Sequence, residues 1–210
     1  MTHQLIWLRG ALDAPALREI EAIFGDKLRA GERLKLDRPL RDRLAPVTQA
    51  VQEQFPKMEP VRALAFDKTP QSNWVLPWHQ DRVIAVSHRH DINGYTSWTR
   101  KSGIWHCEPP VNILQRMLFV RVHIDDADAT TGAMEIAEGS HTDGIIPSEQ
   151  AENIAQSHPR NVTVAQRGDI LILPMLTLHR SIPAQAPSRR RTLRIDYADF
   201  ALDGPLSWAN

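Results

Sequence analysis

The sequence is poor in cysteine and contains no long apolar run. Cys107 is the single cysteine among 210 residues, so the chain can form no internal disulfide and has no cysteine cluster for a structural zinc site. This usage is typical of a reducing compartment, and we expect a cytoplasmic location. No run of about 18 apolar residues occurs, and the first residues lack the basic and apolar segments of a signal peptide, so we expect neither a membrane segment nor secretion.

An excess of charge of one sign is also missing. Lys and Arg together number 25, as do Asp and Glu, which gives a formal net charge of 0. Without a positive field or a basic stripe with interleaved aromatic residues, neither nucleic acid nor a membrane surface is an expected partner. We expect a small-molecule substrate instead, and a monomer or homodimer. The composition, 42% hydrophobic and 24% charged, is that of an ordinary globular protein.

The pattern of apolar residues predicts helices first and strands afterwards. Two amphipathic helices are expected, one starting at Asp13 as its cap and one over residues 40–55. From Val61 onward, short extended runs separated by Pro, Gly, Asn and Asp indicate strands, with short helices near 110–117 and 148–157. Because long helices do not alternate with these strands, the pattern favours a mainly β antiparallel sandwich or barrel.

These elements fit one domain over residues 1–210. Residues 1–60 are expected to form an amino-terminal helical support and residues 61–200 the β core. Residues 87–108 are rich in His, Trp, Gly and Ser, show no period and are long for a plain connection. We therefore expect a substrate-covering loop there. Trp98, Trp105 and His106 are its candidate substrate contacts, although such aromatic residues equally well anchor a loop by packing.

Three residues have the composition of a metal site. His79 and Asp81 are two apart, so on a strand their side chains project from one face. His179 ends a strongly apolar run 100 residues later. Two histidines and one carboxylate are the ligand set of non-haem Fe(II) oxygenases, which leaves coordination positions open for a co-substrate and O₂. A surface His and Asp pair, with a buried structural histidine, is the alternative interpretation.

Three consecutive arginines follow His179 at the start of a returning strand. Arg190 and Thr192 share one face of that strand, and an arginine with a hydroxyl beside it can bind a carboxylate such as that of a dicarboxylic keto acid. A shift of one residue would direct Arg189 or Arg191 inward instead. We favour Arg190, because the alternate positions then form a separate apolar row, which consists of Leu193, Ile195 and Tyr197.

Two further polar residues alternate with an apolar row in the run MLFVRVHIDD. Arg121 and His123 lie on one face of this strand, opposite the apolar residues. In a half-buried sheet the polar row faces solvent, whereas in a barrel with a polar pocket it lines the inside. In the second case Arg121 is a candidate co-substrate ligand and His123 a candidate substrate contact.

The order of these motifs resembles the phytanoyl-CoA dioxygenase family of Fe(II)/2-oxoglutarate-dependent oxygenases. The resemblance covers roughly residues 61–200. It rests on PWHQDR at 77–82, GAMEIAEGSH at 132–141, GDILILP at 168–174, LHRS at 178–181 and Arg190 within SRRRTLRIDY. It implies a double-stranded β-helix (a jelly roll, cupin-like) barrel with amino-terminal helices.

The same resemblance implies a function. Fe(II) would be held by His79, Asp81 and His179, and Arg190 would bind the distal carboxylate of 2-oxoglutarate with help from Thr192. With O₂, such an enzyme hydroxylates a small or medium organic molecule and forms succinate and CO₂. A carboxylate at Asp81 favours hydroxylation over halogenation. The alternatives are a protein or nucleic-acid hydroxylase, a zinc hydrolase on the same three ligands, and a non-catalytic jelly-roll binding module.

Overall fold

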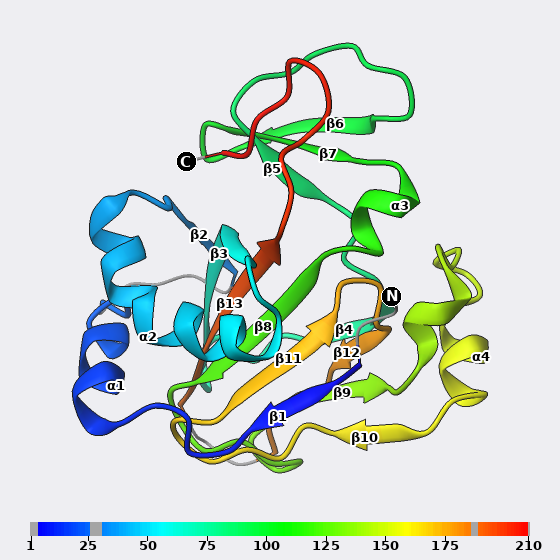
Figure 1. The fold of residues 1–210 in the computed structure, drawn as a ribbon. Helices are drawn as coiled ribbons and strands as arrows, with labels where there is room; N and C mark the ends of the chain where they lie inside the picture. Colours follow the sequence, from blue (N-terminus) through cyan, green and yellow to red (C-terminus); the bar gives the residue numbers. More distant parts are fainter. Residues whose placement is uncertain (1–3, 26–30, 186–188, 210) are drawn as a thin grey trace.

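The chain forms a jelly roll of two facing antiparallel sheets with a third, smaller sheet at one end (Figure 1). The computed structural model describes residues 4–25, 31–185 and 189–209. The large sheet has the order β1 (Ile6–Leu8), β11 (Ile170–Pro174), β8 (Leu118–His123), β13 (Arg190–Ala198), β3 (Glu59–Lys68) and β2 (Glu32–Leu34). The facing sheet has the order β10 (Arg160–Val162), β9 (Met134–Ala137), β12 (His179–Ser181) and β4 (Leu76–His79).

Of the two expected forms, sandwich and barrel, the jelly roll is an open sandwich whose sheets do not close into a barrel. In the described ranges no hydrogen-bonded strand pair joins the two sheets. The large sheet ends on both sides in strands of three residues, β1 and β2, each of which pairs on one side only. Strands this short leave few backbone groups for closure. The mainly β, antiparallel character of the prediction is confirmed.

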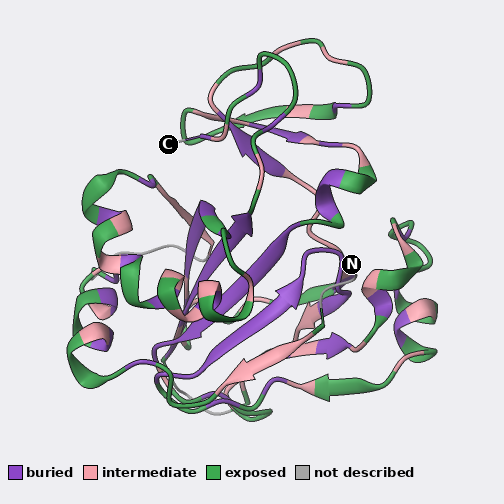
Figure 2. Cartoon of the chain, in the orientation of Figure 1, coloured by how far each residue is buried: buried purple, intermediate pink, exposed green. Residues whose placement is uncertain are grey.

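Alternation along β13 separates an apolar row on the outer face of the large sheet from a polar row on the inner face. In β13 the outward row is Leu193, Ile195 and Tyr197, which packs in the helix-covered core. The inward row of the same strand is Arg190, Thr192, Arg194 and Asp196, all of them buried. Figure 2 shows that the central strands are buried along their length. The inner face is therefore mixed: β13 presents polar groups there, while β8 and β11 place Phe119, Leu171 and Leu173 in a second apolar cluster.

Two helices cover the outer face. α1 (Ala14–Glu21) starts at Asp13, whose side chain accepts a 2.9 Å hydrogen bond from the Ala16 amide, and α2 (Arg38–Gln54) is capped in the same way by Asp37. Both have proline in the first turn, where its missing N–H costs nothing. Residues 1–60 also contain β1 and β2, two strands that the sequence did not predict and that extend the large sheet.

One of two shorter helices covers the outside of the facing sheet. α4 (Ala151–Gln156) packs Ala151 and Ala155 against Trp78 of β4, and α3 (Val111–Leu114) precedes β8. Both lie within the segments where short helices were expected. A 3₁₀ turn, η1 (Ser140–Asp143), follows β9. In the part of the chain that the structure describes, no helix is long and apolar enough to cross a membrane.

The expected substrate-covering segment, residues 87–108, contains two strands after a connection over residues 87–95. β5 (Ile84–Val86), β7 (Ile104–Glu108) and β6 (Thr96–Lys101) make the third sheet. The connection from β6 to β7 is a two-residue hairpin in which Ser102 and Gly103 both have positive φ, 50° and 79°. A Ser-Gly pair suits such a type I′ turn, so the hairpin had a local signal in the sequence.

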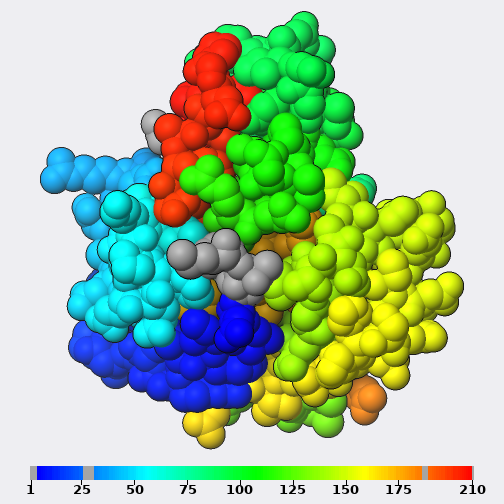
Figure 3. All heavy atoms as spheres, turned by 45° about the vertical axis from the view of Figure 1, so that its right-hand side comes forward, coloured from blue at the N-terminus to red at the C-terminus, as the bar shows by residue number. Residues whose placement is uncertain are grey.

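The carboxy-terminal segment packs on this third sheet. The Ser87 amide donates to the Ser207 carbonyl at 3.0 Å, and the Ala209 amide donates to the Ala85 carbonyl at 3.1 Å. The space-filling view shows this red segment lying against the green residues beside it (Figure 3). These contacts join β5 of the third sheet to the segment that follows β13.

Replacing a residue of the outward row should weaken the fold. Val122 in β8 is fully buried against the helices, so we expect Val122→Ala to lower the free energy of unfolding by about 2 kcal/mol in urea denaturation. The matched control is Val164→Ala, at a side chain 55% exposed, with an expected change below about 0.5 kcal/mol. Equal effects of the two substitutions would contradict this packing.

Candidate metal centre

Two adjacent strands of the smaller facing sheet bring three metal-ligating side chains together. His79 is the last residue of β4 and His179 the first of β12; the two are paired in register and their ring centroids lie 4.3 Å apart. Asp81 follows His79 by two residues. One ligand atom from each of the three lies within 4.8 Å of the others. Among the residues described, this is the one such group of His, Cys, Asp and Glu.

Backbone hydrogen bonds orient both histidines for metal binding. His79 Nδ1 lies 2.7 Å from the Pro77 carbonyl oxygen, and His179 Nδ1 lies 2.9 Å from that of Thr177. Because a carbonyl only accepts, each Nδ1 carries the proton and each Nε2 keeps a free lone pair. Burial lowers the pKa of each ring to about 4. Both rings are therefore neutral near pH 7, as metal ligands must be.

Asp81 is held in place by a buried chain of charges. Its Oδ2 lies 3.2 Å from His179 Nε2 and contacts the guanidinium of Arg194. Arg194 in turn binds Asp196 at 2.7 Å, and Asp196 binds Arg62 at 3.2 Å. Arg194 and Asp196 are almost fully buried. Arg194 and His179 Nε2 thus approach the same carboxylate oxygen of Asp81.

The donor set fits Fe(II). Two neutral imidazole nitrogens and one carboxylate oxygen make the 2-His-1-carboxylate group, which occupies one face of an octahedral ion and leaves the rest open. All three donors come from one end of the β4 and β12 pair. A three-ligand site of this kind also accommodates zinc.

The three ligands open into a cavity of about 310 Å³ between the sheets. Its lining includes six arginines, while Asp81 is the one carboxylate among the lining residues that the structure describes. The arginines are Arg33, Arg62, Arg121, Arg180, Arg190 and Arg194. The cavity is therefore strongly positive, although the chain as a whole has no net charge.

Arg190 and Arg121 are buried cations without a carboxylate partner. Arg190 Nε donates to the Thr131 carbonyl at 3.2 Å, and Arg121 Nη2 donates to the Thr192 hydroxyl at 2.8 Å. Within residues 4–25, 31–185 and 189–209 neither has a carboxylate within 4 Å, and the buried Nε of Arg121 has no hydrogen-bond partner. Burial lowers the pKa of Arg190 to about 10 and that of Arg121 to about 9. Together they fit a carboxylate ligand.

The two neighbouring arginines face away from this cavity. Arg189 binds Asp67 through two nitrogens, at 2.7 and 3.0 Å. Arg191 binds Asp125 and Glu21, each at 2.7 Å. The register of β13 thus places Arg190 inward, opposite Lys68 of β3, and its two neighbours in ion pairs on the other side.

The other predicted site residues lie farther from the cavity. The Thr192 hydroxyl is occupied by Arg121 and does not line the cavity. His123 is buried behind it, with its ring 5.8 Å from that of Trp7 and neither ring nitrogen hydrogen bonded. Trp98 and Trp105 are partly buried on the small sheet, where they pack edge to face at 6.5 Å, and they do not line the cavity. Their packing corresponds to the anchoring alternative.

Arg194, Arg62 and Arg33 line the cavity and were not predicted. Arg194 shares the face of Arg190 by alternation along β13, so continuing the inward row would have found it. Arg62 and Arg33 reach the cavity through the pairing of β13 with β3 and of β3 with β2. That pairing joins residues far apart in the chain and has no local signal.

Comparison with known proteins agrees with this arrangement. The family model described as phytanoyl-CoA dioxygenase (PhyH) matches residues 7–192. Comparison with curated proteins by sequence gives no match.

Solved structures share the fold at low sequence identity. AviO1 from Streptomyces viridochromogenes Tue57 has a TM-score of 0.63 at 19% identity, covering 96% of this chain and 92% of its own. HygX from Streptomyces hygroscopicus, solved with nickel and 2-oxoglutarate bound, has a TM-score of 0.62 at 16% identity, covering 96% and 85%. SnoN, a non-heme alpha-ketoglutarate-dependent epimerase from nogalamycin biosynthesis, has a TM-score of 0.63 at 15% identity, covering 94% of this chain and 78% of its own.

Loss of the Asp81 carboxylate should abolish tight metal binding. We expect Asp81→Asn to weaken Fe(II) affinity more than about 100-fold in anaerobic calorimetry, since a neutral amide replaces the anionic ligand. The control is Asp143→Asn, another aspartate bonded to a histidine, His158, at 2.7 Å. Unchanged affinity in Asp81→Asn would remove Asp81 from the metal centre.

The buried His123 should make the metal-free fold sensitive to acid. Burial, with Arg121 and Arg190 nearby, lowers the pKa of His123 to about 3. Below pH 6.5 the unfolded chain binds a proton there that the folded protein does not, so stability falls as the pH falls. We expect His123→Leu to reduce the stability lost between pH 7 and pH 5 by about 2 kcal/mol. The same substitution at the exposed His88 should leave that loss unchanged.

Proposed function

The chain belongs to the phytanoyl-CoA dioxygenase family, and we propose that it is an Fe(II)- and 2-oxoglutarate-dependent dioxygenase that hydroxylates a small or medium organic molecule, forming succinate and CO₂. One observation carries the proposal. The His79, Asp81 and His179 donors share a single cavity with two buried arginines that lack carboxylate partners. A metal and a dicarboxylate are the two ligands that this arrangement suits.

In this proposal His79, Asp81 and His179 hold the iron. When bound, Fe(II) supplies the activation of O₂ that is coupled to oxidation of 2-oxoglutarate. HygX has been solved with iron bound as well as with nickel and 2-oxoglutarate. The backbone bonds to Nδ1 of both histidines and the contact of Arg194 with Asp81 preset the directions of the three donors before any metal arrives.

Arg190 binds the distal carboxylate of 2-oxoglutarate, and Arg121 supports it. An arginine can bind a carboxylate through two parallel hydrogen bonds, and burial strengthens that pair. Thr192 acts on Arg121, whose Nη2 donates to its hydroxyl. Lys68 is adjacent to Arg190 in register, but its Nζ donates to the Ser181 hydroxyl at 3.1 Å and so helps to fix β12 next to His179.

Several observations favour this function over the alternatives. A zinc hydrolase needs the three metal ligands, but it has no use for two buried arginines without partners. A non-catalytic module has no need for histidines oriented toward one point. The structural neighbours include an epimerase and a carbocyclase. For this chain we propose hydroxylation. A cavity of about 310 Å³ suits a small ligand, and HygX has been solved with hygromycin B bound.

Anaerobic titration with Fe(II) and 2-oxoglutarate tests the proposal. We expect a visible charge-transfer band that needs both components. Arg190→Gln should raise the Kd for 2-oxoglutarate about 10- to 150-fold, because it removes a charge-assisted pair of roughly 1.5 to 3 kcal/mol. Iron affinity should change less than about threefold, since Arg190 is not a ligand. Arg189→Gln is the matched control, because its guanidinium binds Asp67 on the other face.

Two results would contradict the proposal. A folded protein that binds iron but gives no band with 2-oxoglutarate would favour the zinc hydrolase or the binding module. A band that is equally sensitive to Arg189→Gln and Arg190→Gln would remove Arg190 from the co-substrate site. With the band established, O₂-dependent release of succinate during a substrate screen separates hydroxylation from the other reactions by the mass of the product.

A further inference from the structure

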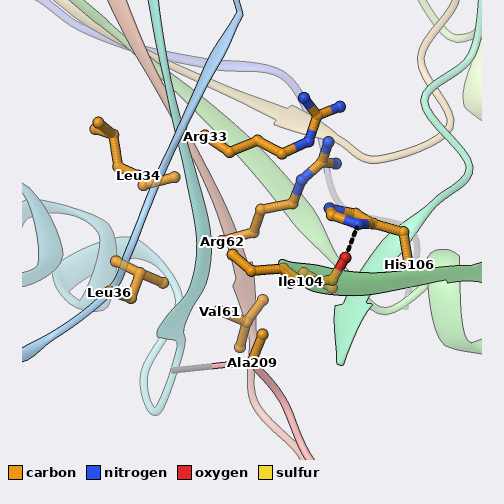
Figure 4. A pocket seen from close by; sticks show the side chains of 10 residues that line it. Arg33, Leu34, Leu36, Val61, Arg62, Ile104, His106 and Ala209 are labelled. Atoms are coloured by element: carbon orange, nitrogen blue, oxygen red, sulfur yellow. Dashed lines mark hydrogen bonds between the residues drawn. The ribbon is translucent and has the colours of Figure 1, made fainter. Parts of the chain in front are cut away.

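A second pair of arginines lies in the cavity, apart from the Arg190 and Arg121 pair. Arg33 comes from β2 and Arg62 from β3. Both line the cavity of the metal centre, and both also line a small neighbouring cavity that contains His106. Figure 4 shows their guanidinium groups next to each other, with the His106 ring beside them. Two like charges are thus brought together at one place.

The strand register fixes these side chains on the inner face of the large sheet. Arg33 is paired with Leu64, which is paired with Arg194 of β13. Arg62 is paired with Asp196 of the same strand. Side chains of directly paired residues lie on one face of a sheet. Arg33 and Arg62 therefore face the same space as Arg194, which contacts the metal ligand Asp81.

The pair is short of counter-charges. Arg62 is only 9% exposed, and its one carboxylate partner, Asp196, is shared with Arg194. Arg33 has no ion pair within the described ranges. The Nε atoms of both arginines are buried without a hydrogen-bond partner. Buried, unpartnered donors are costly in a native protein unless a ligand uses them.

His106 leaves the positive charge of Arg33 and Arg62 unbalanced. Its Nδ1 lies 3.1 Å from the Ile104 carbonyl oxygen and so carries the ring proton. Burial and the nearby Arg62 and Arg33 lower the pKa of His106 to about 4, so the ring is neutral near pH 7. The ring therefore lines the site as a neutral polar group and does not offset the charge of the two arginines.

The co-substrates do not supply the missing charge either. The two positive charges of Fe(II) and the two negative charges of 2-oxoglutarate cancel each other. In the proposed function, 2-oxoglutarate is bound by Arg190 and Arg121. Arg180 is neutralised by Glu135, at 2.7 Å. The arginines at the other end of the cavity still exceed their carboxylates. An anionic ligand would satisfy this excess.

We propose that the substrate of this enzyme carries an anionic group, a carboxylate or a phosphate, which binds to Arg33 and Arg62. The inference rests on the proposed function and names the class of its substrate. Two neighbouring guanidinium groups offer the forked donors that such groups accept. Binding the anion at this end of the cavity leaves the rest of the substrate beside His79, Asp81 and His179.

Calorimetry with matched probes tests the inference. The protein is loaded with Ni(II) and saturating 2-oxoglutarate, so that no turnover occurs and the co-substrate site is filled. Benzoate is compared with benzamide, and phenyl phosphate with phenol. We expect at least one anion to bind with a Kd at least tenfold lower than that of its uncharged counterpart. The two pairs distinguish a carboxylate from a phosphate site.

Variants locate the anion. Arg33→Gln should raise the Kd of the preferred anion about tenfold or more, and Arg33→Lys should recover part of the loss. Arg180→Gln is the matched control, because it removes a guanidinium from the same cavity whose charge Glu135 already offsets. We expect Arg180→Gln to change the Kd of the anion by less than about threefold.

Three outcomes would overturn the inference. One is the absence of binding of either anion at millimolar concentration, and another is equal binding of charged and uncharged probes. The third is a Kd for the anion that rises in proportion to the concentration of 2-oxoglutarate, because such competition would place the anion on Arg190. The charge-transfer band, measured on the same purified protein loaded anaerobically with Fe(II) in place of Ni(II), separates the two claims. A band without anion binding rejects this inference alone, whereas a missing band rejects the proposed function.

Discussion

A buried chain of alternating charges ties the metal centre to the large sheet. Asp81, Arg194, Asp196 and Arg62 follow one another through contacts that run from the loop after β4 into the middle of two central strands. Burying a lone charge is costly, and removing one partner of a buried pair typically costs about 3 to 5 kcal/mol. The side chain of Asp81 is thus linked to the large sheet through Arg194.

The polar cavity is possible because much of the apolar core lies on the outer face of the large sheet. The outward row of the large sheet packs with α1 and α2, and this layer contains most of the aliphatic residues of β8 and β13. The inner face is therefore free to hold arginines around a cavity. One end of that face suits the dicarboxylate co-substrate and the other end an anionic substrate, with the three metal ligands on the opposing sheet.

Local patterns in the sequence predicted the parts of this arrangement that depend on alternation. The apolar row at Leu193, Ile195 and Tyr197 indicated the inward direction of Arg190, and the antiparallel β class followed from the short strands. The pairing of strands far apart in the chain could not be predicted, because β1 and β2 are three-residue strands in a segment interpreted as helical. Arg33 reaches the cavity only through the pairing of β2. The hairpin at Ser102 and Gly103 had a signal that its polar, aromatic surroundings obscured.

The most direct test is a crystal structure grown without oxygen in the presence of Fe(II) and 2-oxoglutarate. The account predicts iron on Nε2 of His79, Nε2 of His179 and one oxygen of Asp81. It also predicts the distal carboxylate of 2-oxoglutarate on Arg190, with Arg33 and Arg62 left free of it. Iron on other side chains, or the distal carboxylate on Arg33 and Arg62, would contradict the division of the cavity described above.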